Sequence, residues 1–206
     1  MQLQVDLEST QQELVYRLSE ALESRSSESG NHAKRVALIS ETIASGTDLD
    51  LEHIELLKNA APLHDVGKIS TPDMILNKPD KLDQDEWKIM EQHAEKGHSI
   101  LKGSNHKIIQ AGAIIAKNHH ENWDGSGYPD GQKGQDIHIF GRIVALADVY
   151  DALRHDRCYK EAWDKSETLS FIQEQSGKKF DPELVQVLMN NVDKLEAILT
   201  LYPENE

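Results

Sequence analysis

The chain of 206 residues contains a single cysteine, Cys158, which excludes an internal disulfide and suits a reducing compartment. It also lacks a long apolar run and a signal-peptide pattern, so the sequence predicts neither a membrane span nor export. Hydrophobic residues make up 38% of the chain and charged residues 28%, which is typical of a globular protein with one well-buried core. These features together predict a cytoplasmic protein.

Positive charge is also scarce. The 22 Lys and Arg residues are outnumbered by 36 Asp and Glu residues, which gives a net charge of −14. A broad footprint on duplex DNA needs a basic face, so the composition argues against DNA as a partner. A small phosphorylated ligand remains compatible with an acidic chain, because bound metal ions can invert the local field.

Convincing period-two alternation is absent, whereas helical spacing is frequent. Residues 1–25 form the first helical segment, in which Leu7, Leu14, Leu18 and Leu22 share one stripe. This amphipathic segment is either a first core helix or a linker helix that pairs with a second copy of itself. Further helices are expected over 32–44, from Asp50 to about 67, and over 83–100, 107–119, 140–153, 166–175 and 182–189. The fold is therefore predicted to be all-α.

Two stretches give more specific expectations. Asp50 is the expected N-cap of its helix, with Leu51, Ile54 and Leu57 facing the core. Residues 121–136 form the longest stretch without periodicity and contain four glycines. Loops this rich in glycine within a compact domain are usually functional or disordered.

Residues that suit a divalent metal lie at or near helix ends or on apolar helices. Imidazole and carboxylate together favour a first-row divalent ion. Asp148 follows the apolar run 143–147, where a buried carboxylate needs a partner. Neighbouring helical residues point about 100° apart, so a His-His pair at a helix end can reach two sides of one cluster. The candidate ligands are His32, His64, Asp65, His93, His119, His120 and Asp148.

Four motifs follow one another along the chain: Asn31-His32-x-x-Arg35-Val36, His64-Asp65-Val66-Gly67-Lys68-Ile69, His119-His120-Glu121-x-x-Asp124-Gly125-x-Gly127-Tyr128-Pro129 and Ala147-Asp148-Val149-Tyr150-Asp151-Ala152-Leu153. His-Asp alone is weak evidence, but its combination with the long His-His and Gly-x-Gly-Tyr-Pro signature is highly specific. From about residue 28 to 189 the sequence strongly resembles the HD-GYP family of bacterial phosphodiesterases, a branch of the HD metallohydrolase superfamily. The resemblance implies an all-helical HD-domain bundle, metal-dependent hydrolysis of cyclic di-GMP and a bacterial cytoplasmic setting. We accordingly expect an N-terminal linker or pairing helix over 1–27 and a catalytic domain over 28–206.

Carried over position by position, the resemblance implies that the candidate ligands hold the metals and that Lys68 contacts the substrate phosphate. Asp65 is well placed to bridge two metals. Glu28 matches a glutamate that some members place four residues before the first histidine and that accompanies a third metal; a solvated loop carboxylate is the alternative. We expect two or three divalent ions, and the lack of thiolate ligands favours iron or manganese. The remaining histidines match no ligand position and are interpreted as surface or structural: His53, His98, His106, His138 and His155.

Substrate-binding residues are expected in two loops. Members usually read Asp-Arg-Pro-Tyr-Lys where residues 156–160 are Asp-Arg-Cys-Tyr-Lys, so Arg157 and Lys160 would face substrate phosphate and guanine. Replacement of the proline by Cys158 predicts a less rigid loop. The glycine-rich loop is expected to form one wall of the cleft, since glycine permits close backbone approach. Its candidate residues are Asp124, Gly125, Gly127 and Tyr128.

Several functional alternatives stay open from the sequence. Tyr128 either stacks on a base, contacts a partner protein through the Gly125–Pro129 loop, or packs that loop down. The implied reaction converts cyclic di-GMP to pGpG, with or without a further step to GMP. The same chemistry could act on mixed cyclic GMP-AMP or on pGpG, and a receptor that binds cyclic di-GMP without hydrolysis is a further class. A homodimer through residues 1–25 is the other expected partnership.

Overall fold

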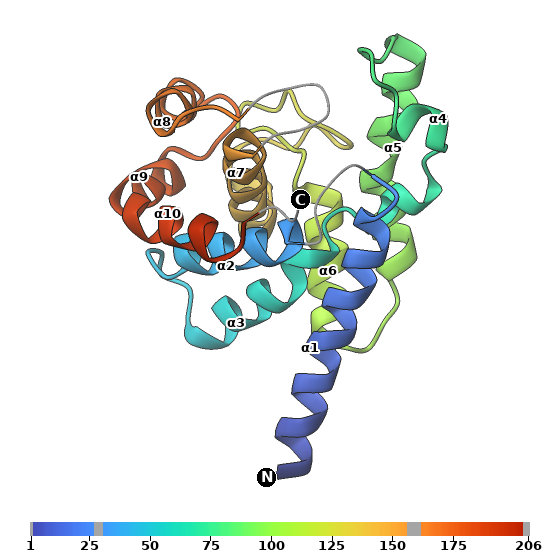
Figure 1. The fold of residues 1–206 in the computed structure, drawn as a ribbon, viewed down its shortest axis with the longest axis vertical. Coiled ribbons are helices and arrows are strands. Elements are labelled where there is room, and N and C mark those ends of the chain that lie inside the picture. Colours follow the sequence, from blue (N-terminus) through green and yellow to red (C-terminus); the bar gives the residue numbers. More distant parts are fainter. Residues whose placement is uncertain (1, 27–30, 156–161, 204–206) are drawn as a thin grey trace.

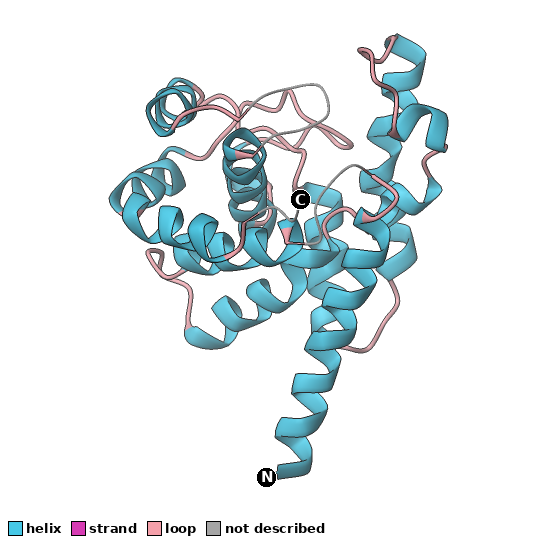
Figure 2. Cartoon of the chain, viewed as in Figure 1, coloured by secondary structure: helices cyan, strands magenta, loops and turns pink. Residues whose placement is uncertain are grey.

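A computed structural model describes residues 2–26, 31–155 and 162–203. Within them the regular elements are helices, apart from one isolated parallel bridge between Ser176 and Phe180 (Figures 1 and 2). The all-α prediction is therefore confirmed. The α-helices are α1 (Gln2–Glu23), α2 (His32–Ala44), α3 (Leu51–Ala60), α4 (Asp73–Leu76), α5 (Gln84–Leu101), α6 (Lys107–Asn118), α7 (Ile139–Arg154), α8 (Lys165–Glu174), α9 (Pro182–Asn190) and α10 (Val192–Leu201), and the 3₁₀ turns are η1 (Ala61–Leu63), η2 (Val66–Ser70) and η3 (Gly134–Asp136).

The core is built around α2 and α7, which pack directly against each other. Helix α7 is buried on most of its circumference, as its nearly continuous apolar sequence predicts, and α6 lies beside it. On α2, Val36, Ile39 and Ile43 are fully buried, as expected from their spacing. Each such side chain contributes roughly 1.5–3 kcal/mol on burial. This rigid centre holds the N-terminal end of α2 against α7.

Helix starts follow the acidic caps in the sequence. Asp50 accepts a hydrogen bond from the His53 backbone N–H, and Asp181 caps α9 through Glu183 N. Asp83 starts α5 in a reciprocal capping box with Glu86. The sequence therefore located the starts of α3, α5 and α9 well.

Three expectations about the helices differ from the structure. The helix from Asp50 ends at Ala60 rather than near residue 67, and η1 and η2 follow it. Leu51 is 84% exposed, because the first turn of α3 extends beyond the core, while Ile54 and Leu57 are buried as expected. Helix α10 was not predicted, although Leu195 on it is fully buried against the core.

Helix α1 confirms that the first segment is helical, but the side chains that it buries are not those of the leucine stripe. Its N-terminal half extends away from the remaining helices (Figure 1), and Val15, Ser19 and Glu23 are buried positions of its C-terminal half. Leu14 and Leu18 are 58% and 61% exposed, so these two members of the leucine stripe do not face the core. The side chain of Leu7 lies outside the described part of the structure. No helix among the described residues combines the length and apolar character needed to cross a membrane.

Candidate metal centre

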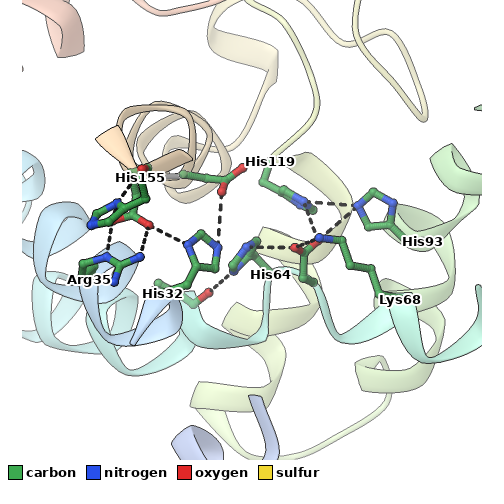
Figure 3. A network of polar contacts seen from close by, with 11 residues as sticks. His32, Arg35, His64, Lys68, His93, His119 and His155 are labelled. Carbon is green, nitrogen blue, oxygen red and sulfur yellow. Dashed lines mark hydrogen bonds and ion pairs between the residues drawn. The ribbon is translucent and has the colours of Figure 1, made fainter. Parts of the chain in front are cut away.

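Five segments of the chain bring the seven candidate ligands together, and Figure 3 shows four of them, His32, His64, His93 and His119, within one network of polar contacts. His32 is the first residue of α2, His64 and Asp65 lie between η1 and η2, and His93 is on α5. His119 and His120 directly follow α6, and Asp148 is on α7. The residues form two groups, and within each group the possible ligand atoms lie within 4.8 Å of one another: Asp65, His93, His119 and His120 in the first, His32, His64 and Asp148 in the second.

Asp65 joins the two groups through its two oxygens. Oδ1 lies 3.4 Å from His93 Nε2 and 3.6 Å from His119 Nε2, both in the first group. Oδ2 lies 3.3 Å from His64 Nε2 in the second group and 2.5 Å from the Lys68 ammonium. One carboxylate thus has an oxygen directed toward each group, which is the arrangement of a bridging ligand.

The imidazole tautomers follow from backbone carbonyls. Nδ1 of His64 is 3.0 Å from Ala61 O, and Nδ1 of His93 is 2.7 Å from Met90 O. Nδ1 of His119 approaches two carbonyls of α6 at 3.1 Å. A carbonyl only accepts, so each Nδ1 carries the proton and each Nε2 presents a lone pair.

His32 is oriented by a carboxylate instead. Its Nδ1 lies 2.8 Å from Asp151 Oδ2, and Arg35 donates to the two oxygens of Asp151 at 2.6 and 3.0 Å. His32, Arg35 and Asp151 are all buried. Nε2 of His32 then faces Asp148 Oδ1 at 3.5 Å. Carboxylate support of this kind is a common outer shell of metal-binding histidines.

The donor atoms fit a divalent cation. Nε2 of His93 and Nε2 of His119 face each other at 3.5 Å although both present lone pairs. Nε2 of His64 and Oδ1 of Asp65 are buried without a hydrogen-bond partner among the described residues. Buried acceptors that converge without donors are costly unless a cation lies among them. The all-nitrogen-and-oxygen set is suited to a divalent first-row metal ion.

Charge within the cluster separates the pKa values of its members. Burial opposes ionisation of Asp65, but Lys68 and His64 outweigh it and hold the pKa of this carboxyl well below its usual value. Burial lowers the pKa of His93 to about 4, and burial with the neighbouring histidines lowers the pKa of His120 well below its usual value. These two imidazoles are therefore neutral at pH 7, which is the state that binds metal.

Gly67 allows the His-Asp segment to reach α5. A Cβ at this position would lie 1.9 Å from the His93 carbonyl oxygen, so a side chain would separate η2 from the helix that carries His93. Lys68, the residue that follows Gly67, contacts Asp65 through its ammonium group. The glycine between the His-Asp pair and the lysine is therefore a packing requirement of the cluster.

The glycine-rich loop is held by Glu121, which is buried and accepts hydrogen bonds from the Asp130 and Gln132 backbone N–H groups at 2.8 and 3.0 Å. A Cβ at Gly127 would lie 2.4 Å from His120 O, so this glycine allows the loop to fold on itself. The ring of Tyr128 stacks on His120, with 4.7 Å between centroids. Tyr128 thus packs at the edge of the ligand cluster.

The remaining candidates of the sequence analysis divide into two sets. Asp124 is exposed and accepts from Ser126 N, and its own N–H donates to Lys178 O, so its carboxylate does not reach the ligand cluster. Gly125 has φ +86°, which a side chain would strain, and is part of the same turn. Three further candidates, Glu28, Arg157 and Lys160, lie outside the described residues.

Sequence reasoning assigned no role to three residues that shape the site: Arg35, Glu121 and Asp151. A signal for each was present, since all three belong to the motifs that contain the ligands. Asp151 also follows Asp148 by three positions and so shares its helix face. His155, interpreted as surface or structural, contacts Asp151 through its Nδ1, 2.9 Å from the backbone oxygen.

Comparison with known proteins identifies the fold and the family. The sequence model described as HD domain matches residues 17–184. A 3′3′-cGAMP-specific phosphodiesterase of Vibrio cholerae is 47% identical over 202 residues, which are 98% of this chain and 39% of that protein. A cyclic di-GMP phosphodiesterase response regulator of Xanthomonas campestris is 42% identical, with 94% of this chain and 51% of that protein covered. The chain thus spans about half or less of the length of these relatives.

Solved structures agree on the fold. A cyclic GMP-AMP-specific phosphodiesterase of V. cholerae superposes with a TM-score of 0.68 at 22% identity, over 93% of this chain and 54% of that chain. The HD domain of a Listeria monocytogenes phosphodiesterase superposes with a TM-score of 0.59 at 16% identity, over 92% of this chain and 99% of that chain. With the His-Asp and Gly-x-Gly-Tyr-Pro motifs in place, the chain belongs to the HD domain family, in its HD-GYP branch.

Proposed function

We propose that this chain is a metal-dependent phosphodiesterase that hydrolyses a cyclic dinucleotide, with cyclic di-GMP as the substrate and pGpG as the first product. The observation that carries the proposal is the arrangement around Asp65. Imidazole nitrogens of both ligand groups lie beside its two carboxylate oxygens, so that nitrogen and oxygen lone pairs converge there. The similarity to cyclic di-GMP phosphodiesterases of X. campestris and Thermotoga maritima supports the substrate class.

The site residues have two proposed roles, which are to hold the metal ions and to stabilise negative charge on the substrate phosphate. His32, His64, Asp65, His93, His119, His120 and Asp148 would hold two divalent ions, which supply Lewis acidity and a water of lowered pKa when bound. Lys68, fixed 2.5 Å from Asp65, is placed to stabilise negative charge that grows on the phosphoryl oxygens. Arg157 and Lys160 are proposed to contact phosphate and guanine, and Asp124, Gly125, Gly127 and Tyr128 to border the substrate.

A third ion is proposed on Glu28. A carboxylate four residues before His32 shares its helix face if that turn is helical, and it offsets repulsion among close dications. We expect three iron or manganese ions in protein purified under reducing conditions, and two in Glu28→Ala with part of the activity retained. Elemental analysis of both proteins decides the count. Equal metal contents would remove the third site.

Mixed cyclic GMP-AMP is the second candidate substrate, because the relative with 47% identity is a 3′3′-cGAMP-specific phosphodiesterase. Parallel turnover assays with cyclic di-GMP, 3′3′-cGAMP and pGpG on the anaerobically purified protein separate the substrates. The proposal expects hydrolysis of a cyclic dinucleotide that is lost on removal of metal and restored by Mn²⁺. Tight nucleotide binding without hydrolysis in the metal-loaded protein would instead identify a receptor.

The setting of the activity is part of the proposal. We propose a cytoplasmic protein with a catalytic domain over 28–206 and a homodimer formed through residues 1–25, in which Leu14 and Leu18 of α1 are exposed. The Gly125–Pro129 loop is proposed as the contact for protein partners. Sedimentation of the wild type and of a Leu14→Glu, Leu18→Glu variant tests the dimer, which the double variant should dissociate.

A further inference from the structure

Helix α1 contacts the chain on both sides of the His64–Asp65 pair. Before the pair, the Ser19 hydroxyl donates to Pro62 O at 2.8 Å in a buried position, and Val15 packs in a cluster with Leu63. These contacts fix α1 against η1, directly ahead of His64.

Beyond the pair, Arg25 holds the end of η2. Its Nη1 donates to Ile69 O at 3.0 Å and approaches Lys68 O at 3.4 Å, and its Nη2 donates to Thr71 O at 3.2 Å. The carboxylate of Asp73 pairs with the same guanidinium. A single side chain, two residues beyond the end of α1, thus contacts three carbonyls and one carboxylate in and after the turn that carries the candidate catalytic lysine.

The same junction is secured in the opposite direction. The side-chain amide of Asn77 donates to the Arg25 backbone carbonyl at 2.9 Å. The residues after α1 are thereby joined to the chain before and after α4. Arg25 takes part through its side chain and also through its backbone carbonyl.

The turn that Arg25 contacts has little support of its own. A 3₁₀ turn has poorer hydrogen-bond geometry than an α-helix, and the last carbonyls of any helical segment lack partners within it. In η2 the Lys68 N–H donates to Asp65 O and the Thr71 N–H donates to Lys68 O. Arg25 supplies donors to carbonyls at the C-terminal end, so it stabilises the backbone from which the Lys68 side chain reaches Asp65.

We propose that Arg25 is a positioning residue for Lys68, and that it acts through the backbone carbonyls at the end of η2 rather than by contact with substrate. Its guanidinium fork is suited to several carbonyls at once, which a lysine ammonium at the same position reaches less completely. The activity consequence rests on the proposed function, whereas the effect on η2 does not.

The structural test uses hydrogen exchange of the metal-loaded protein. Arg25→Ala should accelerate exchange of the Lys68 and Thr71 amides at least tenfold and leave the amides of α7 unchanged, with Arg25→Lys intermediate. The matched control is Arg17→Ala, since Arg17 is on the exposed face of α1 and pairs only with Glu13 and Glu20 in the described structure. Unchanged exchange at Lys68 and Thr71 in folded Arg25→Ala would overturn the proposal.

The kinetic test is a double-mutant cycle with Lys68→Ala. Arg25→Ala should lower kcat about ten- to hundredfold, as expected for misplacement of a catalytic group, with metal content unchanged. In a Lys68→Ala background the same substitution should have little further effect, which a general loss of stability would not reproduce. Fully additive losses would overturn the coupling. A wild type without turnover, combined with faster exchange in Arg25→Ala, would reject the proposed function while supporting the role of Arg25 in holding η2.

Discussion

The two groups of candidate ligands orient their imidazoles in different ways. In the group of Asp65, His93 and His119, the orienting acceptors are carbonyls three or four residues earlier in the chain, such as Met90 for His93. In the other group, His32 is oriented by Asp151, which is 119 positions away and is held by Arg35. His64 belongs to the second group but is oriented locally, by Ala61 O.

This difference teaches which parts of the site depend on tertiary structure. A carbonyl of the same turn is present whenever the local backbone forms, so His93, His119 and His64 acquire their tautomers with their own segments. The tautomer of His32 requires α2 and α7 to be docked. The second group is therefore the one whose metal affinity can be altered from outside the ligand set, while Asp65, a member of the first group, also directs one oxygen toward His64 of the second.

The largest effect is expected from removal of the Asp65 carboxylate, because its two oxygens lie beside histidines of both groups. Asp65→Ala should abolish hydrolysis and lower bound metal, and His64→Ala should do the same through the second group. Metal analysis with turnover of the proposed substrate checks both. His106→Ala, a change at an exposed histidine outside the ligand set, should leave both values unchanged. Full activity with unchanged metal in Asp65→Ala would refute the assignment.

Lys68→Ala should separate charge stabilisation from metal binding. The lysine contacts Asp65 but supplies no lone pair to a metal, so metal content should stay near the wild-type value. The value of kcat should fall, because the transition state loses about 2–4 kcal/mol of stabilisation. Steady-state kinetics beside elemental analysis measures the two effects. Lys102→Ala, at an exposed lysine, is the control. Wild-type turnover in Lys68→Ala would leave the lysine with no role in the reaction.

The candidate ligands of both groups could be predicted from the sequence, whereas the outer supports of the second group could not. The seven candidate ligands stood out because histidine and aspartate are unusual next to apolar runs such as 143–147 and at helix ends. Asp151 lies on the same helix as Asp148 and carries the same type of side chain, yet only the docking of α2 on α7 shows that it faces Nδ1 of His32. Local pattern identifies residue types, whereas the partner of a side chain across 119 positions depends on topology.

The same distinction explains the helix errors. Leu14 and Leu18 have core spacing, but Val15 and Ser19 face the body because η1 and η2 lie on that side of α1. Helical periodicity gives a stripe and cannot tell whether the molecule or the solvent lies against it. The α-helix that starts after Asp50 ends at Ala60, because Pro62 in η1 has no backbone N–H with which to continue the helical hydrogen bonds.

Asp151→Asn should separate the two groups of candidate ligands, because it should weaken metal binding by the His32 group alone. Loss of the carboxylate should lower the metal affinity of the His32 group about 10- to 100-fold and leave the other group unchanged, since its anchors are backbone carbonyls. Stepwise metal titration of refolded apoprotein resolves the two affinities. The substitution also leaves Arg35 buried opposite a neutral amide, so the free energy of unfolding should fall by about 3–5 kcal/mol.

The control for this experiment is Asp193→Asn, a fully exposed carboxylate whose only described contact is with Lys165. It should change neither metal affinity nor stability. Equal weakening of both groups in Asp151→Asn would show that Asp151 supports the whole fold and not His32 in particular.

The smallest expected effect is a difference in titration between the groups in the metal-free protein. Burial lowers the pKa of His93 to about 4, whereas for His64 the same burial is outweighed by Asp65 and Asp148, which raise its pKa. The unfolded chain binds a proton at His93 near pH 6.5, so between pH 6.5 and 4 the unfolded state binds more protons there and stability falls as the pH falls. At His64 the sign is opposite, since the folded state binds the proton more tightly: its contribution is fully present below pH 6.5 and is lost as the pH rises through the folded pKa. Long-range ¹H–¹⁵N correlation spectra of the imidazoles should therefore show His64 protonated and His93 neutral at pH 5, and Asp65→Asn should lower the pKa of His64. Protonation of both rings together at pH 6.5 would contradict the assigned roles of burial and of Asp65, and the two groups would then be electrostatically equivalent.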